Sequence, residues 1–200
     1  ANTLVQDVLV GGGVTVSNIT YTGHANAIGK FETGSTTTNL GLSSGIILST
    51  GYATSASFPS NYSGGSASFQ FGLPGFNLLT NIAGGNTFDA AVLSFYFVPI
   101  SDTIQFRYVF ASEEYHFYVN SQYNDVFGFF LTGPNPQGPY YNNRNIALIP
   151  GTPQPVSINT VNNGQTSSPC SPGPCNNCQY FVDNRCIPGQ FVVYDGFTTV

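Results

Sequence analysis

The residues best suited to chemistry lie in one short polar stretch. Glu113 and Glu114 are followed closely by Asn124 and Asp125, in a chain in which only 6% of the residues are charged. Calcium takes six to eight oxygen ligands from carboxylates, amides and carbonyls. The stretch therefore predicts a calcium site formed by Glu113, Glu114, Asn124 and Asp125, with Asp89 as a contributor from a neighbouring strand.

The same side chains also suit a purely structural network. Asp125 and Asn124 can cap a turn by accepting hydrogen bonds from backbone amides. The two glutamates can be solvated or paired with Arg107. The sequence leaves the calcium site and the structural network open as alternatives.

A catalytic role is a weaker interpretation of these carboxylates. A two-carboxylate glycosidase needs its carboxyl groups about 5 to 9 Å apart, whereas adjacent residues of an extended chain point to opposite sides. Glu113 and Glu114 are therefore a poor pair for each other, and neither His24 nor His116 belongs to a known catalytic motif. We expect no enzymatic activity and no catalytic residues.

Two strands must position this polar stretch. Ile104, Phe106, Tyr108 and Phe110 alternate with other residues, which predicts a strand over Thr103–Ala111. A turn at 101–102 makes that strand the antiparallel neighbour of another over Asp89–Pro99. Beyond the polar stretch, alternating phenylalanines up to Phe129 indicate a further strand, so the site would be a loop held between core strands.

The rest of the chain reads as short strands separated by turns. Only one helix is expected, over 76–83, where apolar residues recur at helical spacing before Gly84 and Gly85. Residues 134–145 read as a long polar turn. Further strands are expected at 14–21, 28–31, 45–51, 146–149, 156–161, 179–182 and 191–194. This pattern predicts an all-β fold, an antiparallel β-sandwich of the jelly-roll type with one short helix.

Composition limits the partners and the compartment. Hydrophobic residues make up 41% of 200 residues, enough for one packed domain, and four basic residues with a net charge of −5 give no surface for nucleic acid or anionic lipid. No apolar run is long enough for membrane insertion. A chain that starts at Ala1 and has no methionine is typical of a processed, exported product, which predicts a secreted or cell-surface location.

Four cysteines lie in the last third of the chain, at Cys170, Cys175, Cys178 and Cys186. In an exported protein they predict two disulfides, with zinc as the rival because two of them have ligand-like spacing. Cys178 and Cys186 flank a hairpin-like segment, so we expect these two to pair with each other and Cys170 to pair with Cys175.

Several blocks together resemble the choice-of-anchor L domain, a family of secreted bacterial surface proteins. They are GVTVSNITYTG, GLSSGIILSTG, DAAVLSFYFVP, FRYVFASEEY, YNDVFGFFLTGP, NIALIPGTPQPVSINTVNNG, and YFVDN followed by YDGFT. The resemblance implies an exported module attached to the cell surface, and we expect a non-catalytic structural module of an extracellular assembly that associates with itself or with other surface proteins. A calcium-dependent, lectin-like adhesin that binds carbohydrate is the alternative.

Family members usually continue past the YDGFT block, so the resemblance also implies an incomplete strand near Val200. We expect residues 14–200 to form the domain and residues 1–13 to form an N-terminal strand segment. In that segment Leu4, Val8 and Val10 are apolar and precede three glycines. We therefore expect this segment to be available to complete the sheet of a neighbouring subunit by β-strand addition, which would give a filament.

Overall fold

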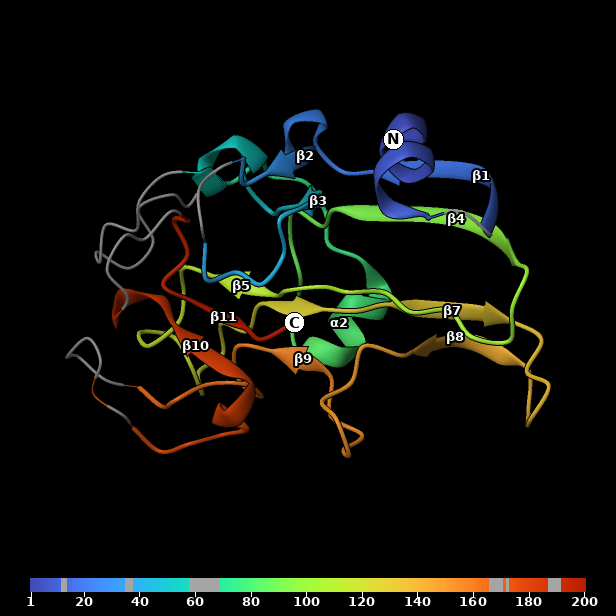
Figure 1. The fold of residues 1–200 in the computed structure, drawn as a ribbon. Coiled ribbons are helices and arrows are strands. Elements are labelled where there is room, and N and C mark those ends of the chain that lie inside the picture. Colours follow the sequence, from blue (N-terminus) through green and yellow to red (C-terminus); the bar gives the residue numbers. More distant parts are fainter. Residues whose placement is uncertain (12–13, 35–37, 58–68, 166–170, 172, 187–191) are drawn as a thin grey trace.

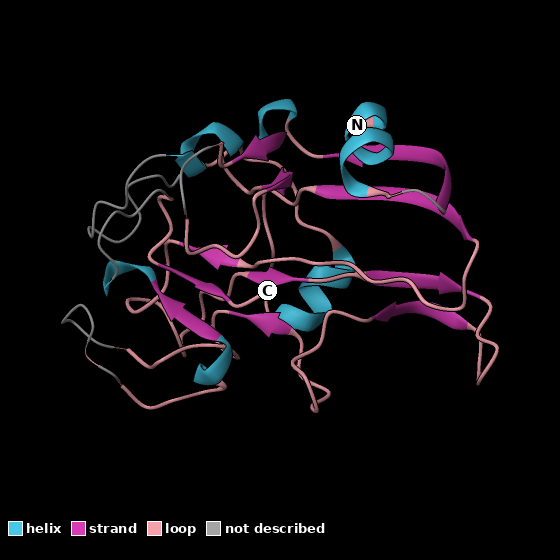
Figure 2. Cartoon of the chain, in the orientation of Figure 1, coloured by secondary structure: helices cyan, strands magenta, loops and turns pink. Residues whose placement is uncertain are grey.

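Antiparallel strands make up most of the regular structure in the computed structural model, which describes residues 1–11, 14–34, 38–57, 69–165, 171, 173–186 and 192–200. The strands lie in two layers (Figures 1 and 2). The all-β, antiparallel class predicted from the sequence is confirmed.

The first layer contains two strand pairs. β1 (Val14–Thr22) pairs with β4 (Val92–Pro99), with Val14 opposite Pro99 at one end and Thr22 opposite Val92 at the other. β2 (Ile28–Glu32) pairs with β3 (Ser44–Leu48). In β1 and β4 half-buried residues alternate with exposed ones, as expected for a sheet with one face toward the core.

The second layer is assembled from shorter strands. β5 (Ala111–Ser112), β11 (Gly196–Thr198) and β10 (Phe181–Asp183) form a three-stranded sheet with β11 in the centre. β6 (Val126–Phe127) pairs with β9 (Val156–Ser157), and β7 (Phe130–Gly133) pairs with β8 (Tyr141–Asn145). The buried core clusters contain Tyr115, Val119 and Ile158, and Ile149, Val156 and Val161; Phe110 and Phe181 pack against both.

The predicted helix is confirmed as α2 (Asn77–Ala83). It ends at Gly84, whose φ of 73° is the left-handed conformation that favours glycine and lets its N–H bond to the Thr80 carbonyl. Single turns of 3₁₀-helix complete the regular structure: η2 (Ala25–Ala27), η3 (Ala53–Ser57), η4 (Cys178–Tyr180) and η5 (Asn184–Cys186).

The N-terminal segment was expected to be a strand segment, but within this single chain it is helical; its exchange with a neighbour stays a prediction. Residues 2–9 form a short helix, with α1 (Asn2–Leu4) followed by the π-helical turn η1 (Val5–Leu9). Leu4, Val5, Val8 and Leu9 recur at i and i+4, so one helical face is apolar. The Val5 side chain is 0% exposed, and η1 contacts β1 and β3. The helical period in this segment thus prevailed over its β-branched composition.

Further predictions fail around the second half of the chain. The strand expected over Thr103–Ala111 is reduced to β5, and β4 pairs with β1 rather than with this segment. Residues 134–145, expected to be a polar turn, contain β8 instead, which pairs with β7. Within β8 the Arg144 guanidinium lies 5.7 Å from the centre of the Tyr141 ring. The strand predicted over 146–149 is reduced to an isolated bridge between Leu148 and Pro155.

Candidate functional site

One hydroxyl links two carboxylate-bearing residues of the polar stretch. The Ser112 hydroxyl, at the end of β5, donates to Asp125 Oδ2 at 2.7 Å and accepts the Glu114 backbone N–H at 3.0 Å. Asp125 immediately precedes β6, and its carbonyl accepts the Ile158 N–H, which fixes its backbone. The stretch is thereby folded so that Glu114 and Asp125 share one partly buried environment.

Burial changes the protonation of these groups. Loss of water and, to a smaller extent, the nearby Asp125 carboxylate together raise the pKa of Glu114 from its ordinary value of 4.5 to about 7. Burial also raises the pKa of Asp125, although the hydrogen bond from Ser112 opposes the increase. The Glu114 carboxyl therefore holds its proton to a higher pH than an ordinary glutamate does.

The neighbouring Tyr115 belongs to the same environment. Its ring is fully buried against Phe181, at a centroid distance of 4.7 Å, and burial together with the Asp125 charge raises the pKa of its hydroxyl. In the part of the chain that the structure describes, this hydroxyl has no hydrogen-bond partner. These three side chains can bind or release a proton, but they include no nucleophile activated by a base.

The other predicted calcium ligands have backbone partners elsewhere. Asn124 donates to the Ala83 carbonyl at the end of α2 and accepts the Asn159 N–H. Asp89, whose φ is 51°, accepts the N–H groups of Phe71 and Leu73 with its two carboxylate oxygens. Both side chains thus tie loops to their neighbours, as the structural alternative expected.

Glu113 affects a different group from Glu114. Its charge contributes, after burial, to raising the pKa of Tyr194 to about 12. Among the described residues, no group of three or more His, Cys, Asp or Glu side chains is arranged to hold a metal ion. Calcium binding by this stretch stays a prediction.

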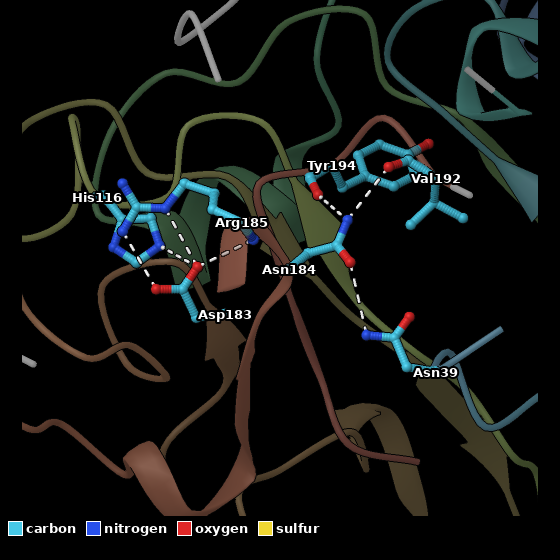
Figure 3. A network of polar contacts seen from close by, with 7 residues as sticks. All are labelled: Asn39, His116, Asp183, Asn184, Arg185, Val192 and Tyr194. Atoms are coloured by element: carbon cyan, nitrogen blue, oxygen red, sulfur yellow. Dashed lines mark hydrogen bonds and ion pairs between the residues drawn. The ribbon is translucent and has the colours of Figure 1, made fainter. Parts of the chain in front are cut away.

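A second polar network, which the sequence analysis did not find, is buried beside β10 (Figure 3). Asp183 accepts two hydrogen bonds from the Arg185 guanidinium at 3.1 and 3.2 Å, and His116 Nε2 lies 3.4 Å from the same carboxylate. Burial alone would raise the Asp183 pKa, but contacts with His116 and Arg185 hold it well below its ordinary range. The cluster joins β10 to the polar stretch.

Asn184 extends this network toward the C-terminal strand. Its amide donates to the carbonyls of Val192 and Tyr194 at 3.2 and 2.8 Å, and its carbonyl oxygen accepts from Asn39 at 3.5 Å (Figure 3). The only signal in the sequence was the DNR tripeptide at 183–185. Its partners lie up to 145 residues away, so no local pattern could have identified them.

The cysteines form disulfides, but in a different pairing from the one expected. Cys175 is bonded to Cys178, which excludes both predicted pairs. Cys186 is disulfide-bonded as well, and Cys170 lies outside the described residues. The turn at Asn177, with φ at 50°, lets the chain reverse so that two cysteines three residues apart meet.

The segment Ile104–Val109 presents an open main-chain edge. It runs extended beside the second layer (Figure 1), and its rings contact two rings there at a tilt, with Phe106 4.6 Å from Phe129 and Tyr108 4.7 Å from Phe127. Within the described residues, no backbone hydrogen bond engages any N–H or carbonyl of this segment. Such an edge is a template for another strand.

Phe110, the residue after this segment, shows to which side the backbone groups of the segment point. The Phe110 carbonyl accepts the Thr198 N–H, and the Phe110 N–H donates to the Thr198 hydroxyl. Because backbone groups alternate along an extended chain, those of Tyr108 and Phe106 point to the same side as those of Phe110. Beyond Thr198 the Thr199 N–H donates to the Tyr180 carbonyl, which continues the pairing of β11 with β10.

An open cavity adjoins the far end of this edge. It has a volume of about 320 Å³ and is lined mainly by Val14, Pro99, Ile100, Ile104 and Gln105. Ile100 is 82% exposed there, a large value for an isoleucine outside an interface. The segment therefore combines unbonded backbone groups with an adjacent apolar recess.

Comparison with known proteins gives one match. The family model of the choice-of-anchor L domain matches residues 1–200, the whole chain. No curated protein and no solved structure matches. None of the helices in the described ranges is long and apolar enough to cross a bilayer.

Proposed function

This chain belongs to the choice-of-anchor L domain family of surface-associated bacterial modules, and from this we propose that it is a non-catalytic structural subunit of an extracellular assembly. In this proposal the subunits join by β-strand addition and form a filament. The observation that carries it is the open edge of Ile104–Val109, with no backbone partner among the described residues.

The physical argument is the cost of an unpaired edge. Backbone N–H and carbonyl groups that are removed from water without a partner lose a hydrogen bond each, and proteins protect exposed edges against unwanted pairing. Here Ile104, Phe106 and Tyr108 are half-buried, while the backbone between them is unbonded. An added strand satisfies these groups and covers the apolar recess at Ile100.

Composition supports a packing role over a catalytic one. Only 6% of the residues are charged; Asp89 bonds to backbone groups, and Asp125 accepts the Ser112 hydroxyl. A polar, nearly uncharged surface has little long-range repulsion between copies. Close association of many identical subunits therefore meets a small electrostatic barrier.

Electron microscopy and sedimentation of the purified full chain test the proposal. We expect ordered polymers whose fraction rises with protein concentration. Monodisperse monomers at every concentration, together with binding to a glycan array that requires calcium, would instead support the lectin-like adhesin. Turnover of a polysaccharide that is lost in Glu114→Gln would contradict the non-catalytic assignment.

A further inference from the structure

We propose that the disulfide between Cys175 and Cys178 is a thiol–disulfide exchange site, at which Cys175 reacts reversibly with the thiol of a small molecule or of another protein. The two cysteines have the Cys-X-X-Cys spacing that disulfide oxidoreductases use. Three observations support the proposal: the exposure of one of the two cysteines, a hydrogen bond to its sulfur, and a loop that is held in place without the disulfide.

The two cysteines differ in their access to solvent. Cys175 is exposed, whereas Cys178 is half-buried. Exchange begins when a thiolate attacks one sulfur of the bond, and the rate depends on access to that sulfur. Exposed disulfides are also the ones that act as labile, regulatory or catalytic bonds. An incoming thiol is therefore directed to Cys175.

A backbone hydrogen bond reaches the sulfur of Cys175. The Cys178 N–H donates to Cys175 Sγ at 3.2 Å. Neutral sulfur is a weak acceptor, but a hydrogen bond to an ionised acceptor is about twice as strong as one between neutral groups. The bond therefore strengthens when the disulfide opens and Cys175 carries the negative charge. Within the described part of the chain, no corresponding donor reaches the sulfur of Cys178.

The loop that carries the two cysteines is held by hydrogen bonds that do not involve sulfur. Asn176 pairs with Asn162 in an antiparallel bridge, through its N–H at 3.0 Å and its carbonyl at 2.9 Å. The Asn176 amide also donates to the Asn159 carbonyl, and the Asn177 amide donates to the Thr160 carbonyl at 2.9 Å. Both residues between the cysteines are thus anchored to the loop that follows β9.

Opening of the disulfide should therefore leave the loop in place. The Cα atoms of Cys175 and Cys178 are 5.2 Å apart in the closed form. Because the anchoring bonds lie on the two asparagines between them, the two thiols of the reduced form remain neighbours and can close again. A cross-link over so short a loop also contributes little to the stability of the fold. The bond is accordingly better suited to exchange than to holding the domain together.

The exchange step transfers one bond and one electron pair. The thiolate of the reactant attacks Cys175 Sγ and forms a new S–S bond, while the old bond breaks with its electron pair on Cys178 Sγ, which takes up a proton from water. The product is a mixed disulfide at Cys175 with a free thiol at Cys178. In the reverse step the Cys178 thiolate attacks Cys175 Sγ, and the reactant leaves as a thiolate.

A dithiol reactant carries the reaction to a two-electron reduction. Its second thiolate attacks its own sulfur in the mixed disulfide, and the reactant is oxidised to its disulfide. Cys175 then leaves as the thiolate that the Cys178 N–H stabilises. The protein gains two electrons and, once both sulfurs are protonated, two protons.

Reduction of the folded full chain tests the proposal. The protein is treated with dithiothreitol at neutral pH, free thiols are alkylated at intervals, and the labelled cysteines are assigned by peptide mass spectrometry. We expect Cys175 and Cys178 to be labelled about ten-fold faster than Cys186, which is disulfide-bonded, half-buried and next to the buried Arg185. Circular dichroism should not change meanwhile. Equal labelling rates, or loss of the folded signal with the first disulfide, would overturn the proposal.

Two matched serine variants identify the reacting sulfur. Cys178→Ser leaves Cys175 with the backbone N–H of residue 178, whereas Cys175→Ser leaves Cys178 without such a donor. With glutathione disulfide, we expect Cys178→Ser to form its mixed disulfide about five-fold faster than Cys175→Ser. Equal rates, or a faster reaction of Cys175→Ser, would refute the role of Cys175.

A last pair of incubations separates the two sources of thiol. The original protein is incubated with reduced glutathione or with a small folded protein that has one exposed cysteine, and the mixtures are quenched in acid. Adducts at Cys175 with both reactants would support exchange with protein thiols, and adducts with glutathione alone would assign a small-molecule reactant. Adducts with neither would contradict the proposal. Polymerisation of the subunits affects none of these readouts, so the proposed function is tested separately.

Discussion

Glu114→Gln is predicted to stabilise the protein at alkaline pH and to leave its stability unchanged in acid. The Glu114 pKa is raised from 4.5 in an ordinary environment to about 7 in the folded protein. A shift of that size corresponds to at most about 3.4 kcal/mol. Because the side chain is partly open to solvent, we reduce the expected effect to about 1 to 2 kcal/mol.

The direction follows from proton binding in the two states. Below pH 4.5 the carboxyl is protonated in both the folded and the unfolded chain, so the raised pKa costs nothing. As the pH rises from 4.5 through about 7, the unfolded chain loses its proton first, and the stability that protonated Glu114 provides is progressively lost. Glutamine carries no such charge and avoids this loss.

Urea unfolding at several pH values between 4 and 8.5 measures the effect. The free energies of unfolding of the two proteins should agree near pH 4, and Glu114→Gln should be more stable by the stated amount at pH 8. Asp102→Asn, a change at an exposed turn, is the control for removing one negative charge. A glutamine variant less stable than the original protein at pH 8 would refute the reasoning.

The same two proteins test the predicted calcium site. Calcium held by Glu114 and Asp125 would raise the melting temperature of the original protein by mass action, and Glu114→Gln would lose that increase. Equal melting temperatures of the original protein in millimolar calcium and in chelator would contradict the predicted site.

Three further changes test other contacts. Arg185→Ala should lower the free energy of unfolding by about 3 kcal/mol in urea titrations, because the mostly buried Asp183 carboxylate loses its partner; a loss no larger than that of an exposed arginine would contradict this. Cys175→Ser should lower the free energy of unfolding by only about 2 kcal/mol, since its disulfide closes a loop of four residues. A non-reducing peptide map of the original protein should show Cys175 joined to Cys178. Gly75→Ala should lower the stability by about 2 kcal/mol in thermal unfolding, because a Cβ there would overlap the Thr87 carbonyl; an unchanged midpoint would show that this loop adjusts freely.

Short sequence patterns correctly predicted those helices and strands that are determined by residues close together in the chain. α2 is identified by its apolar spacing and its terminating glycine, and β1 and β4 by their alternation. The N-terminal segment is helical in this chain although its valine-rich composition favours a strand, because its helical spacing lets Val5 be buried. The partner of β4 was wrong because sequence adjacency favours a hairpin, whereas the ladder is made with β1.

The candidate site, too, was predicted only in part. Glu114 and Asp125 do share one environment, as their closeness in the sequence suggested. Asp89 and Asn124 do not join them, because each has backbone groups within reach that bind its oxygens or amide. Which of several polar partners a carboxylate takes depends on tertiary positions, and these are not encoded in spacing along the chain.

The central place of β11 has a mechanical consequence. Its residues pair with β10 on one side and with β5 on the other, and Asn184 is bonded to the chain that leads into it. A pull along this strand would load both ladders in shear at once rather than open them one bond at a time. Pulling on this end of the domain should therefore give a single rupture at high force, with little extension before it.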